Sequence, residues 1–186
     1  KGMEKGHAAS VHAMLGLGGI PRSNDYSAVD IGCGNGWVCR LLAQDDSCTR
    51  VLGVDGSEAM ISKAKQIDAS GDYQVTKLPE WTPTEKFDFI HTMEFLYYLQ
   101  DPQSMLKQLH EDWLNSGGMM VAGVDHYREN EDSHDWPEAL NVHMTTLSID
   151  EWKAAMIDAG FIDVEMHQVA ASDSFVGTLV MCGKKI

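Results

Sequence analysis

The stretch Val29-Asp30-Ile31-Gly32-Cys33-Gly34-Asn35-Gly36-Trp37 decides the fold that we predict for this chain. It opens with β-branched side chains that favour extended backbone, and three alternate glycines follow them. Glycine tolerates positive φ angles, so a ligand can lie directly against the backbone of such a loop. Apolar residues then recur at helical spacing over 37–43. The pattern predicts a strand, a ligand-binding loop and a helix N-terminus that suits a carboxylate or a phosphate.

The spacing of the glycines distinguishes between two kinds of cofactor loop. A dinucleotide-binding loop needs glycine at its first, third and sixth positions, the sixth because helix and strand pack closely there. The sixth position of this loop is Trp37, and its indole is too bulky for that packing. The spacing therefore disfavours NAD and FAD. A nicotinamide-dependent oxidoreductase stays an alternative, which tight NADH binding would reveal.

Length and charge limit the class of protein. The 186 residues fit a single domain, 1–186, with a core of ordinary size. No apolar run approaches the roughly 20 residues that cross a bilayer, and the N-terminus lacks a signal-peptide pattern. We therefore expect a cytoplasmic protein without a membrane partner; Lys1 is not an initiator methionine, which leaves a longer natural N-terminus open. The net charge of −14, from 28 acidic and 14 basic side chains, disfavours nucleic-acid partners.

The spacing of cysteine and histidine argues against a metal site. The four cysteines form no Cys-x-x-Cys pair, so we predict that they are reduced packing residues. A set of His126, Glu129 and His134 lacks diagnostic ligand spacing, and we predict no metal. His7 and His12 lie in an apolar helix pattern, and we interpret them as packing residues.

Alternating apolar segments and turn residues predict a doubly wound α/β fold. An N-terminal helix is expected within residues 1–21, before the first strand. Later strands are expected at 50–55, 73–75, 87–92, 119–124, 161–169 and 178–182. Later helices are expected at 58–69, 102–113 and 148–159, with Ser57 as an N-cap and Ser148 with Glu151 as a capping box. Parallel βαβ units place ligands at the carboxyl ends of the strands.

An acidic residue, Asp55, ends the second predicted strand. An acid about 20 residues past the glycines can accept two hydrogen bonds from a ribose diol. Gly56 follows it and lets the chain pass close to a flat ring. The sequence therefore predicts a nucleoside site at the ends of the first two strands.

These motifs, in this order, resemble the class I S-adenosylmethionine (SAM)-dependent methyltransferases over about residues 28–185. Besides the glycine loop, the resemblance rests on Val54-Asp55, Leu78-Pro79, Phe87-Asp88-Phe89-Ile90, Gly117-Gly118, Ala159-Gly160-Phe161, Gly177-Thr178-Leu179-Val180 and Gly183-Lys184-Lys185. It implies a Rossmann-like seven-stranded sheet, mostly parallel with an antiparallel last strand, and helices on both faces. It also implies SAM as cofactor and S-adenosylhomocysteine as product.

The resemblance assigns cofactor contacts residue by residue. Gly32, Gly34 and Gly36 would approach the methionine portion of SAM, and Asp30 would help hold its amino group. Asp55 would bind the ribose, with Gly56 and Ser57 beside the adenine. Many relatives have an aspartate after strand three, but this chain has Thr76 nearby, so the adenine contact is expected from Thr76 or from backbone. Cys33 and Met93 complete the predicted cofactor set.

Two later segments are predicted to supply catalysis and acceptor recognition. Glu94 follows the fourth strand and is a candidate base or ammonium-binding group. His126 is the first choice for a general base, because imidazole titrates near neutrality, and Tyr127 lies beside it. Residues 125–147 are expected to cover the cofactor pocket. The predicted acceptor-binding residues are Phe95, Tyr97, Glu129, Asn130, Trp136 and His143.

The predicted function is methyl transfer from SAM to a small molecule, because the chain has no evident extra domain that could grip a macromolecule. We expect a monomer or a homodimer. Methylation of a protein side chain is one alternative, and a SAM-binding regulatory protein without turnover is another. The glycine loop binds cofactor in all three cases and does not separate them.

Overall fold

The computed structural model describes residues 2–20 and 24–186, with side chains from residue 6 onward within those ranges. Its centre is one seven-stranded sheet with the order β3-β2-β1-β4-β5-β7-β6. The strands are β1 Tyr26–Ile31, β2 Cys48–Asp55, β3 Asp72–Val75, β4 Phe87–Met93, β5 Leu114–Val124, β6 Ile162–Val169 and β7 Thr178–Lys184. Only β7 runs antiparallel to its neighbours, β5 and β6. The predicted Rossmann-like sheet is confirmed.

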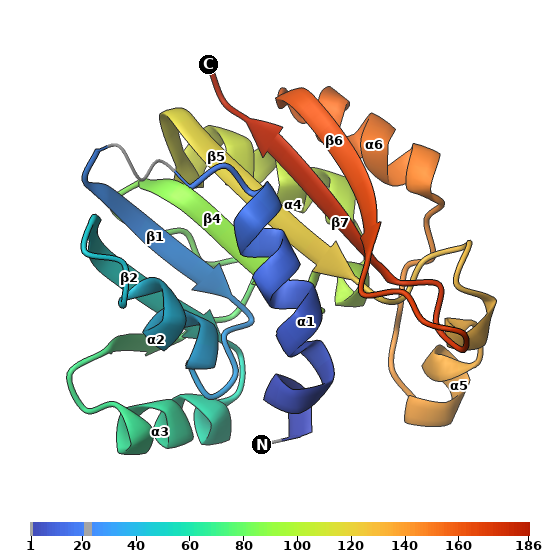
Figure 1. Ribbon diagram of the computed structural model, residues 1–186, viewed down its shortest axis with the longest axis horizontal. Coiled ribbons are helices and arrows are strands. Elements are labelled where there is room, and N and C mark those ends of the chain that lie inside the picture. The colour runs from blue at the N-terminus through green and yellow to red at the C-terminus, as the bar shows by residue number, and fades with distance from the viewer. Residues whose placement is uncertain (1, 21–23) are drawn as a thin grey trace.

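Helices cover both faces of the sheet (Figure 1). They are α1 Gly2–Leu17, α2 Trp37–Leu42, α3 Glu58–Ile67, α4 Pro102–Gln108, α5 Trp136–Leu140 and α6 Ile149–Asp158. Side chains alternate along each strand, so Ala28 and Phe89 pack with α1 and α2. Their neighbours Val29 and Ile90 pack on the other face, in the cluster that contains residues of α4 and α6. Each face therefore has its own apolar core.

Helix caps form where the sequence predicts them. The Ser57 hydroxyl accepts a hydrogen bond from the N–H of Met60 at the start of α3. Ser148 and Glu151 form a complete capping box at the start of α6. Such caps satisfy N–H groups that have no partner inside the helix. They fix where each helix leaves the carboxyl edge of the sheet.

The predicted boundary between the fourth helix and the fifth strand is wrong. The α-helix ends at Gln108, a π-helical turn spans Leu109–Trp113, and β5 begins at Leu114 instead of residue 119. Backbone bonds between Gly117, Gly118 and Lys185 hold the glycine segment beside the end of the chain. Long-range pairing therefore extends the strand through a segment that reads locally as a turn.

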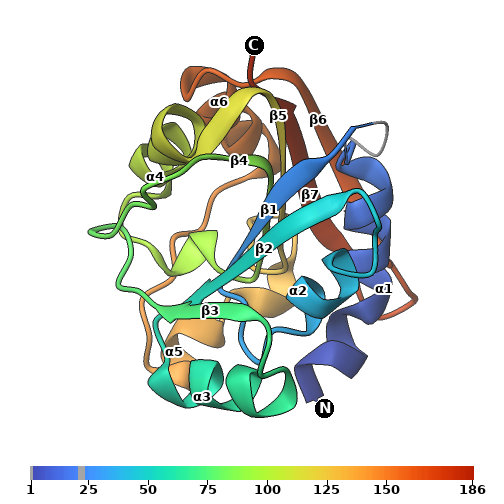
Figure 2. The same cartoon turned by 90° about the vertical axis from the view of Figure 1, so that its left-hand side faces the viewer.

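The N-terminal end of α1 lies toward the same end of the molecule as α3 and α5, as Figures 1 and 2 both show. The parallel strands also point their carboxyl ends there (Figure 1). In such sheets ligands bind at this edge, where the strand order reverses. The fold therefore brings α1, which precedes the glycine loop in sequence, to the edge where the glycine loop lies.

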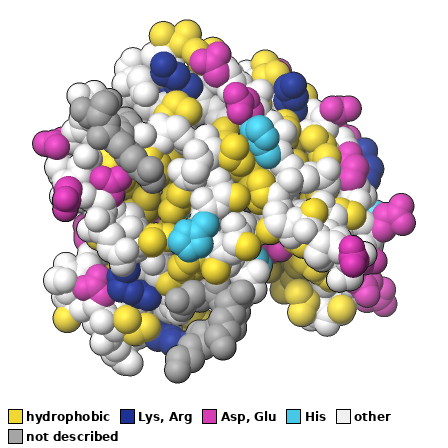
Figure 3. Space-filling view, in the orientation of Figure 1, with side chains coloured by type: hydrophobic (Ala, Val, Ile, Leu, Met, Phe, Trp, Pro, Cys, Tyr) yellow, Lys and Arg dark blue, Asp and Glu magenta, His cyan; other side chains and the backbone are white. Residues whose placement is uncertain are grey.

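Most acidic side chains lie on the surface, whereas three of the four cysteines lie in the core. Acidic side chains are spread around the face seen in Figure 3. All four cysteines are free thiols, and Cys33, Cys39 and Cys182 are buried among core residues. Burial raises the pKa of Cys182 to about 12. Within the described residues, no helix has both the length and the apolar character that a bilayer crossing requires.

Candidate active site

A cavity of about 760 Å³ lies at the carboxyl edge of the sheet. The loops after β1, β2 and β3 line one end of it, which we call the cofactor end. The end of β4, the 3₁₀ helix η1 (Leu96–Tyr98) and α1 line the other, which we call the acceptor end. The two ends are continuous. A ligand at the glycine loop would therefore extend toward side chains of β4 and α1.

The three alternate glycines have two different functions. All have positive φ angles, of 73° at Gly32, 54° at Gly34 and 74° at Gly36. Gly32 and Gly34 line the cavity, and a Cβ on Gly34 would meet no atom within 4 Å. Gly36 is not among the lining residues, and a Cβ there would overlap the ring of Tyr73. The third glycine is therefore required by packing under the loop, which the sequence interpretation did not foresee.

Asp55 joins the end of β2 to the glycine loop. One carboxylate oxygen accepts a hydrogen bond from the Gly34 N–H at 2.9 Å, and the other accepts from the Ser57 N–H at 2.8 Å. Each carboxylate oxygen can accept a second bond, and Asp55 lines the cavity. Ser57 is not among the lining residues and caps α3 instead. Asp55 can hold a diol while it fixes the loop.

Two buried polar atoms at the cofactor end have no protein partner among the described residues. They are the hydroxyl oxygen of Thr76 and Nε2 of His91, and both residues line the cavity. The other ring nitrogen of His91 lies 2.7 Å from a carboxylate oxygen of Asp30. The Cys39 thiol donates weakly to the second oxygen of Asp30 at 3.7 Å. A buried polar atom without a partner costs free energy, so both atoms indicate a polar ligand.

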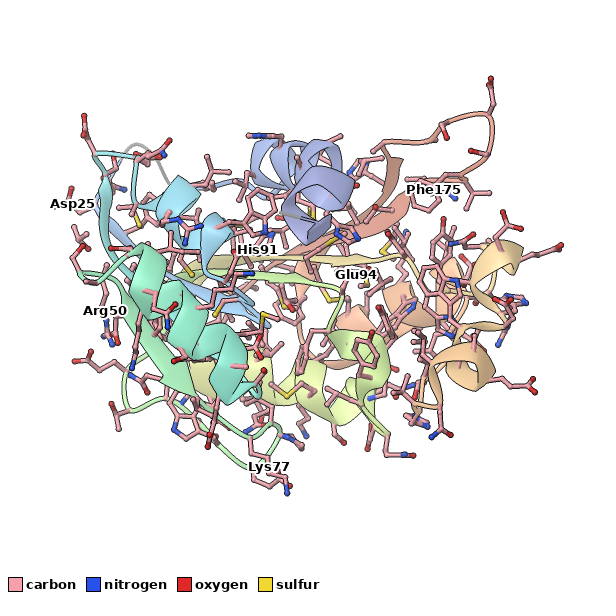
Figure 4. All side chains as sticks on the ribbon, turned by 90° about the horizontal axis from the view of Figure 1, so that it is seen from below. Asp25, Arg50, Lys77, His91, Glu94 and Phe175 are labelled. Atoms are coloured by element: carbon pink, nitrogen blue, oxygen red, sulfur yellow. The ribbon has the colours of Figure 1, made fainter. Side chains whose placement is uncertain are left out.

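Glu94 dominates the acceptor end. It has a φ of 56°, a strained value for a residue with a side chain, and it lies directly after β4. Its carboxylate accepts hydrogen bonds from the Tyr97 hydroxyl at 2.7 Å and from the Asp125 N–H at 2.6 Å. Burial and the nearby Asp125 carboxylate raise the pKa of Glu94 to about 7, although the Tyr97 bond opposes this. Figure 4 shows Glu94 and His91 in the interior.

Two further side chains, those of His7 and Asp125, lie close to Glu94, and neither was predicted as a site residue. His7 from α1 lines the cavity, and its Nε2 lies 3.5 Å from Asp125. Asp125 is buried at the end of β5, where it accepts a 2.6 Å hydrogen bond from Thr178. A ring nitrogen of His7 and one carboxylate oxygen each from Glu94 and Asp125 all lie within 4.8 Å of one another. His7 was interpreted as a packing residue, because nothing in its helix indicates which strand end it meets.

A model of a methyltransferase-domain family matches residues 8–166. The chain belongs to the SAM-dependent methyltransferases. Trans-aconitate 2-methyltransferase of Variovorax paradoxus is 28% identical to this methyltransferase over 114 residues, which cover 61% of this chain and 44% of that protein. The chain spans less than half the length of the curated relatives with which it aligns.

Solved structures agree with the fold of this methyltransferase. The methyltransferase partner of the Haloferax volcanii Trm112 methyltransferase activator is 27% identical with a TM-score of 0.86, covering 98% of this chain and 91% of that chain. N-methyltransferase NodS from Bradyrhizobium japonicum, in complex with S-adenosyl-L-homocysteine, is 20% identical with a TM-score of 0.71. That match covers 94% of this chain and 84% of NodS, and it shows the fold alone.

The cofactor end of this methyltransferase fits SAM. The open space above Gly34 admits a ligand against the backbone, and Asp55 presents a carboxylate for a ribose. The Thr76 hydroxyl and His91 Nε2 offer polar atoms without protein partners among the described residues. The predicted cofactor residues that line the cavity are Asp30, Gly32, Cys33, Gly34, Asp55, Gly56, Thr76 and Met93.

The segment 125–147 does not bring its predicted catalytic residues to the cavity of this methyltransferase. Both ring nitrogens of buried His126 have partners, the Ser133 carbonyl at 3.0 Å and the Thr146 hydroxyl at 2.7 Å. Burial lowers the pKa of His126. The buried hydroxyl of Tyr127 donates to the Gly177 carbonyl at 2.8 Å. His126 is engaged within the segment and Tyr127 ties it to Gly177, so the geometry does not support either residue as a base.

Of the predicted acceptor-binding residues, the two near the end of β4 line the cavity and the four in segment 125–147 do not. Phe95 and Tyr97 line the cavity as predicted. The lining does not include Glu129, Asn130, Trp136 and His143. Glu129 accepts from the Ile149 N–H, and Asn130 donates to the Asp125 carbonyl at 2.6 Å. The N–H of Thr145 donates a hydrogen bond to the Tyr97 carbonyl, and its hydroxyl donates to the Leu99 carbonyl. The segment 125–147 therefore holds η1 in place.

Proposed function

We propose that this methyltransferase domain transfers a methyl group from SAM to a small-molecule acceptor held beside Glu94. The observation that carries the proposal is the cavity of about 760 Å³, which reaches from the glycine loop to Glu94. A donor at one end would meet an acceptor at the other within one continuous cavity. The name of one relative, trans-aconitate 2-methyltransferase, also describes a small-molecule acceptor.

Residues of the cofactor end are proposed to bind SAM as follows. Gly32, Cys33 and Gly34 lie against the methionine portion, Asp55 accepts from the ribose hydroxyls, and Thr76 bonds the adenine. We assign the amino group to His91 rather than to Asp30, because the Asp30 carboxylate already contacts His91 and Cys39. When the His91 nitrogen beside Asp30 carries the proton, Nε2 is an acceptor, and an ammonium group is a donor.

Glu94 is proposed as the general base. SAM supplies, when bound, a methyl group on a positively charged sulfur. An acceptor that carries a proton must lose it before or during attack. With a pKa of about 7, Glu94 is partly ionised at neutral pH and can accept that proton. The Tyr97 hydroxyl and the Asp125 N–H hold its two oxygens in fixed directions.

The proposed state of assembly is a monomer or a homodimer. A relative at 27% identity occurs in complex with a methyltransferase activator. Assays should therefore compare the chain alone with the chain mixed with that activator. Turnover by the isolated chain would support the proposal, and turnover only in the mixture would replace it with a hetero-complex.

Transfer of a deuterated methyl group tests the function. Mass spectrometry would follow transfer from deuteromethyl-SAM to a panel of small amines, alcohols and thiols, and to proteins of a cell extract. We expect a labelled small molecule, and Glu94→Gln should lower kcat by about 10²- to 10⁴-fold. S-adenosylhomocysteine affinity should change less than about twofold. Glu165→Gln, an exposed acid on β6, is the matched control.

Two results would contradict the proposal in different ways. Label found only in proteins would favour the protein side-chain alternative. Tight S-adenosylhomocysteine binding without transfer to any acceptor would favour a regulatory protein that lacks turnover. Equal turnover by the Glu94→Gln variant and the wild type would remove Glu94 from the mechanism and leave the function standing.

A further inference from the structure

Among the described residues, the acceptor end of the cavity carries negative charge without a lysine or arginine beside it. Glu94 and His7 line this end, and Asp125, which is not itself among the lining residues, lies against both of them. Among the described residues at this end, His7 is the one group that can become a cation. The lysines that line the cavity are Lys63 and Lys77, on α3 and after β3, which is the cofactor end. The Lys77 side chain is 88% exposed and extends outward in Figure 4. An anionic acceptor would find no lysine or arginine beside Glu94 among these residues.

Hydrogen bonds hold the two carboxylates close together in spite of their like charge. Thr178 donates to one oxygen of Asp125, and the second oxygen faces His7 at 3.5 Å. The Asp125 N–H in turn donates to Glu94. Two carboxylates this close repel each other unless a cation or a shared proton lies between them. Burial and this repulsion raise the pKa of Glu94 to about 7, although the hydrogen bonds from Tyr97 and Asp125 and the charge of His7 oppose them.

We infer that the acceptor is an amine, which enters as an ammonium group and docks between Glu94, Asp125 and His7. This inference rests on the proposed function, whose substrate class it specifies. An ammonium group offers several N–H donors and a positive charge, which both carboxylates require. Phe95, Tyr97 and Tyr98 line the same end and present aromatic surface to the organic part of the amine.

The proton and electron balance of the reaction is complete with these groups. The bound ammonium gives one proton to the Glu94 carboxylate and becomes a neutral amine. The amine nitrogen lone pair then forms the new bond to the methyl carbon, and the carbon–sulfur bond breaks with its electron pair on sulfur. The positive charge moves from sulfur to the methylated nitrogen, and Glu94 returns its proton to water before the next turnover. No oxidant, reductant or metal takes part.

Matched acceptors separate an amine site from the alternatives. The probes are phenethylamine, 2-phenylethanol and phenylacetate, and the shorter series butylamine, butanol and butyrate. Binding to the chain saturated with S-adenosylhomocysteine would be measured by calorimetry, and methyl transfer by mass spectrometry. In both series we expect the amine to bind at least about tenfold more tightly than the carboxylate, with the alcohol between them.

Variants locate this preference at the two carboxylates. Glu94→Gln and Asp125→Asn should each weaken amine binding by about tenfold or more, because each removes a charged hydrogen-bond acceptor. Alcohol binding should change by less than about twofold in both. S-adenosylhomocysteine affinity reports that each variant is folded, and Glu165→Gln should behave as wild type.

Several outcomes would overturn the inference. Preference for the alcohol or the carboxylate, no preference in either series, or unchanged amine affinity in both variants would each do so. Turnover that stops with a chelator and returns with Mn²⁺ would assign the three groups to a metal ion instead. If methyl transfer to alcohols occurs while amines are ignored, the amine is wrong and the proposed function stands. If the folded wild type does not bind S-adenosylhomocysteine, both fail.

Discussion

The two ends of the cavity are built in different ways. The cofactor end is lined by residues of one short stretch, 29–37, together with residues after β2 and β3, among them Asp55 and Thr76, and His91 of β4. The acceptor end consists of side chains from α1 and from the end of β4 with η1, and Asp125 after β5 lies against it. These segments are distant in sequence and meet only in the folded chain. In the proposed assignment, a local motif binds the cofactor, and tertiary packing assembles the acceptor site. This division lets one fold serve many acceptors.

The largest effect is expected at Gly36, where the loop packs on the core. Gly36→Ala would force a side chain to a φ of 74° and against the buried Tyr73 ring. We expect the free energy of unfolding to fall by about 3 kcal/mol, from left-handed strain and overpacking together. Urea denaturation would measure it.

Gly34→Ala is the matched control for this prediction. Its φ is also positive, at 54°, but a Cβ would project into open cavity space. Stability should fall by only about 1 kcal/mol, while S-adenosylhomocysteine affinity falls by about tenfold. Equal stability losses in the two variants would break the distinction between a packing glycine and a ligand-facing glycine.

The acceptor end should make stability depend on pH through Glu94. Its pKa is about 7 in the folded chain against the ordinary 4.5, and Asp125, His7 and Tyr97 face it. The folded chain then binds more protons than the unfolded chain between these values, so stability falls as pH rises through this window. Glu94→Gln cannot titrate. Relative to wild type, the variant should gain about 2 to 3 kcal/mol between pH 5 and pH 8.

Parallel urea titrations of the two proteins at several pH values would measure this gain. The Glu165→Gln variant should follow wild type throughout. A constant difference between Glu94→Gln and wild type across the range would mean that Glu94 has an ordinary pKa and that its surroundings do not resist its charge.

A smaller and opposite pair of effects is expected at Thr76. Its buried hydroxyl has no protein partner in the described chain, so Thr76→Val should stabilise the ligand-free protein by about 1 kcal/mol. The same change should weaken S-adenosylhomocysteine binding by about fivefold, because a hydrogen bond to the ligand is lost. Thermal unfolding with and without ligand would measure both. Unchanged affinity would remove Thr76 from the cofactor site.

The smallest effect on turnover is expected at His126. Both ring nitrogens bond within the segment 125–147, so His126→Ala should destabilise the protein by about 2 kcal/mol. Turnover per folded molecule should stay within about threefold of wild type. Activity assays normalised by S-adenosylhomocysteine binding sites would measure it. Abolished turnover with intact cofactor affinity would restore His126 as the base predicted from the sequence.

The sheet and the position of the glycine loop were predictable because short-range rules govern them, whereas the roles of Gly36 and His91 depend on tertiary packing. Alternation along strands, Ser57 and Ser148 at helix starts, and glycine spacing before α2 all act within a few residues. The start of β5 was not predictable in the same way. Its glycine segment pairs with Lys185 at the other end of the chain, and no local pattern encodes that partner.

The acceptor end shows the same limit more strongly. Glu94 was predicted because it directly follows a strand, but His7 and Asp125 were missed. The position of His7 depends on how α1 packs across the sheet. Asp125 is the first residue of the polar segment 125–147, in which the sequence favoured His126 instead. Side-chain type alone favoured imidazole as a base. Only the fold shows that His126 is buried in hydrogen bonds while Glu94 faces the cavity.

Calorimetric titration with S-adenosylhomocysteine of the wild type, Asp55→Ala and Glu94→Gln tests the division between the two ends most directly. Asp55→Ala removes the ribose acceptor and the bonds that hold Gly34 and Ser57, so affinity should fall by about tenfold or more. Glu94→Gln should bind within about twofold of wild type. No binding by the folded wild type, or equal losses in the two variants, would contradict a cofactor end that is separate from the acceptor end.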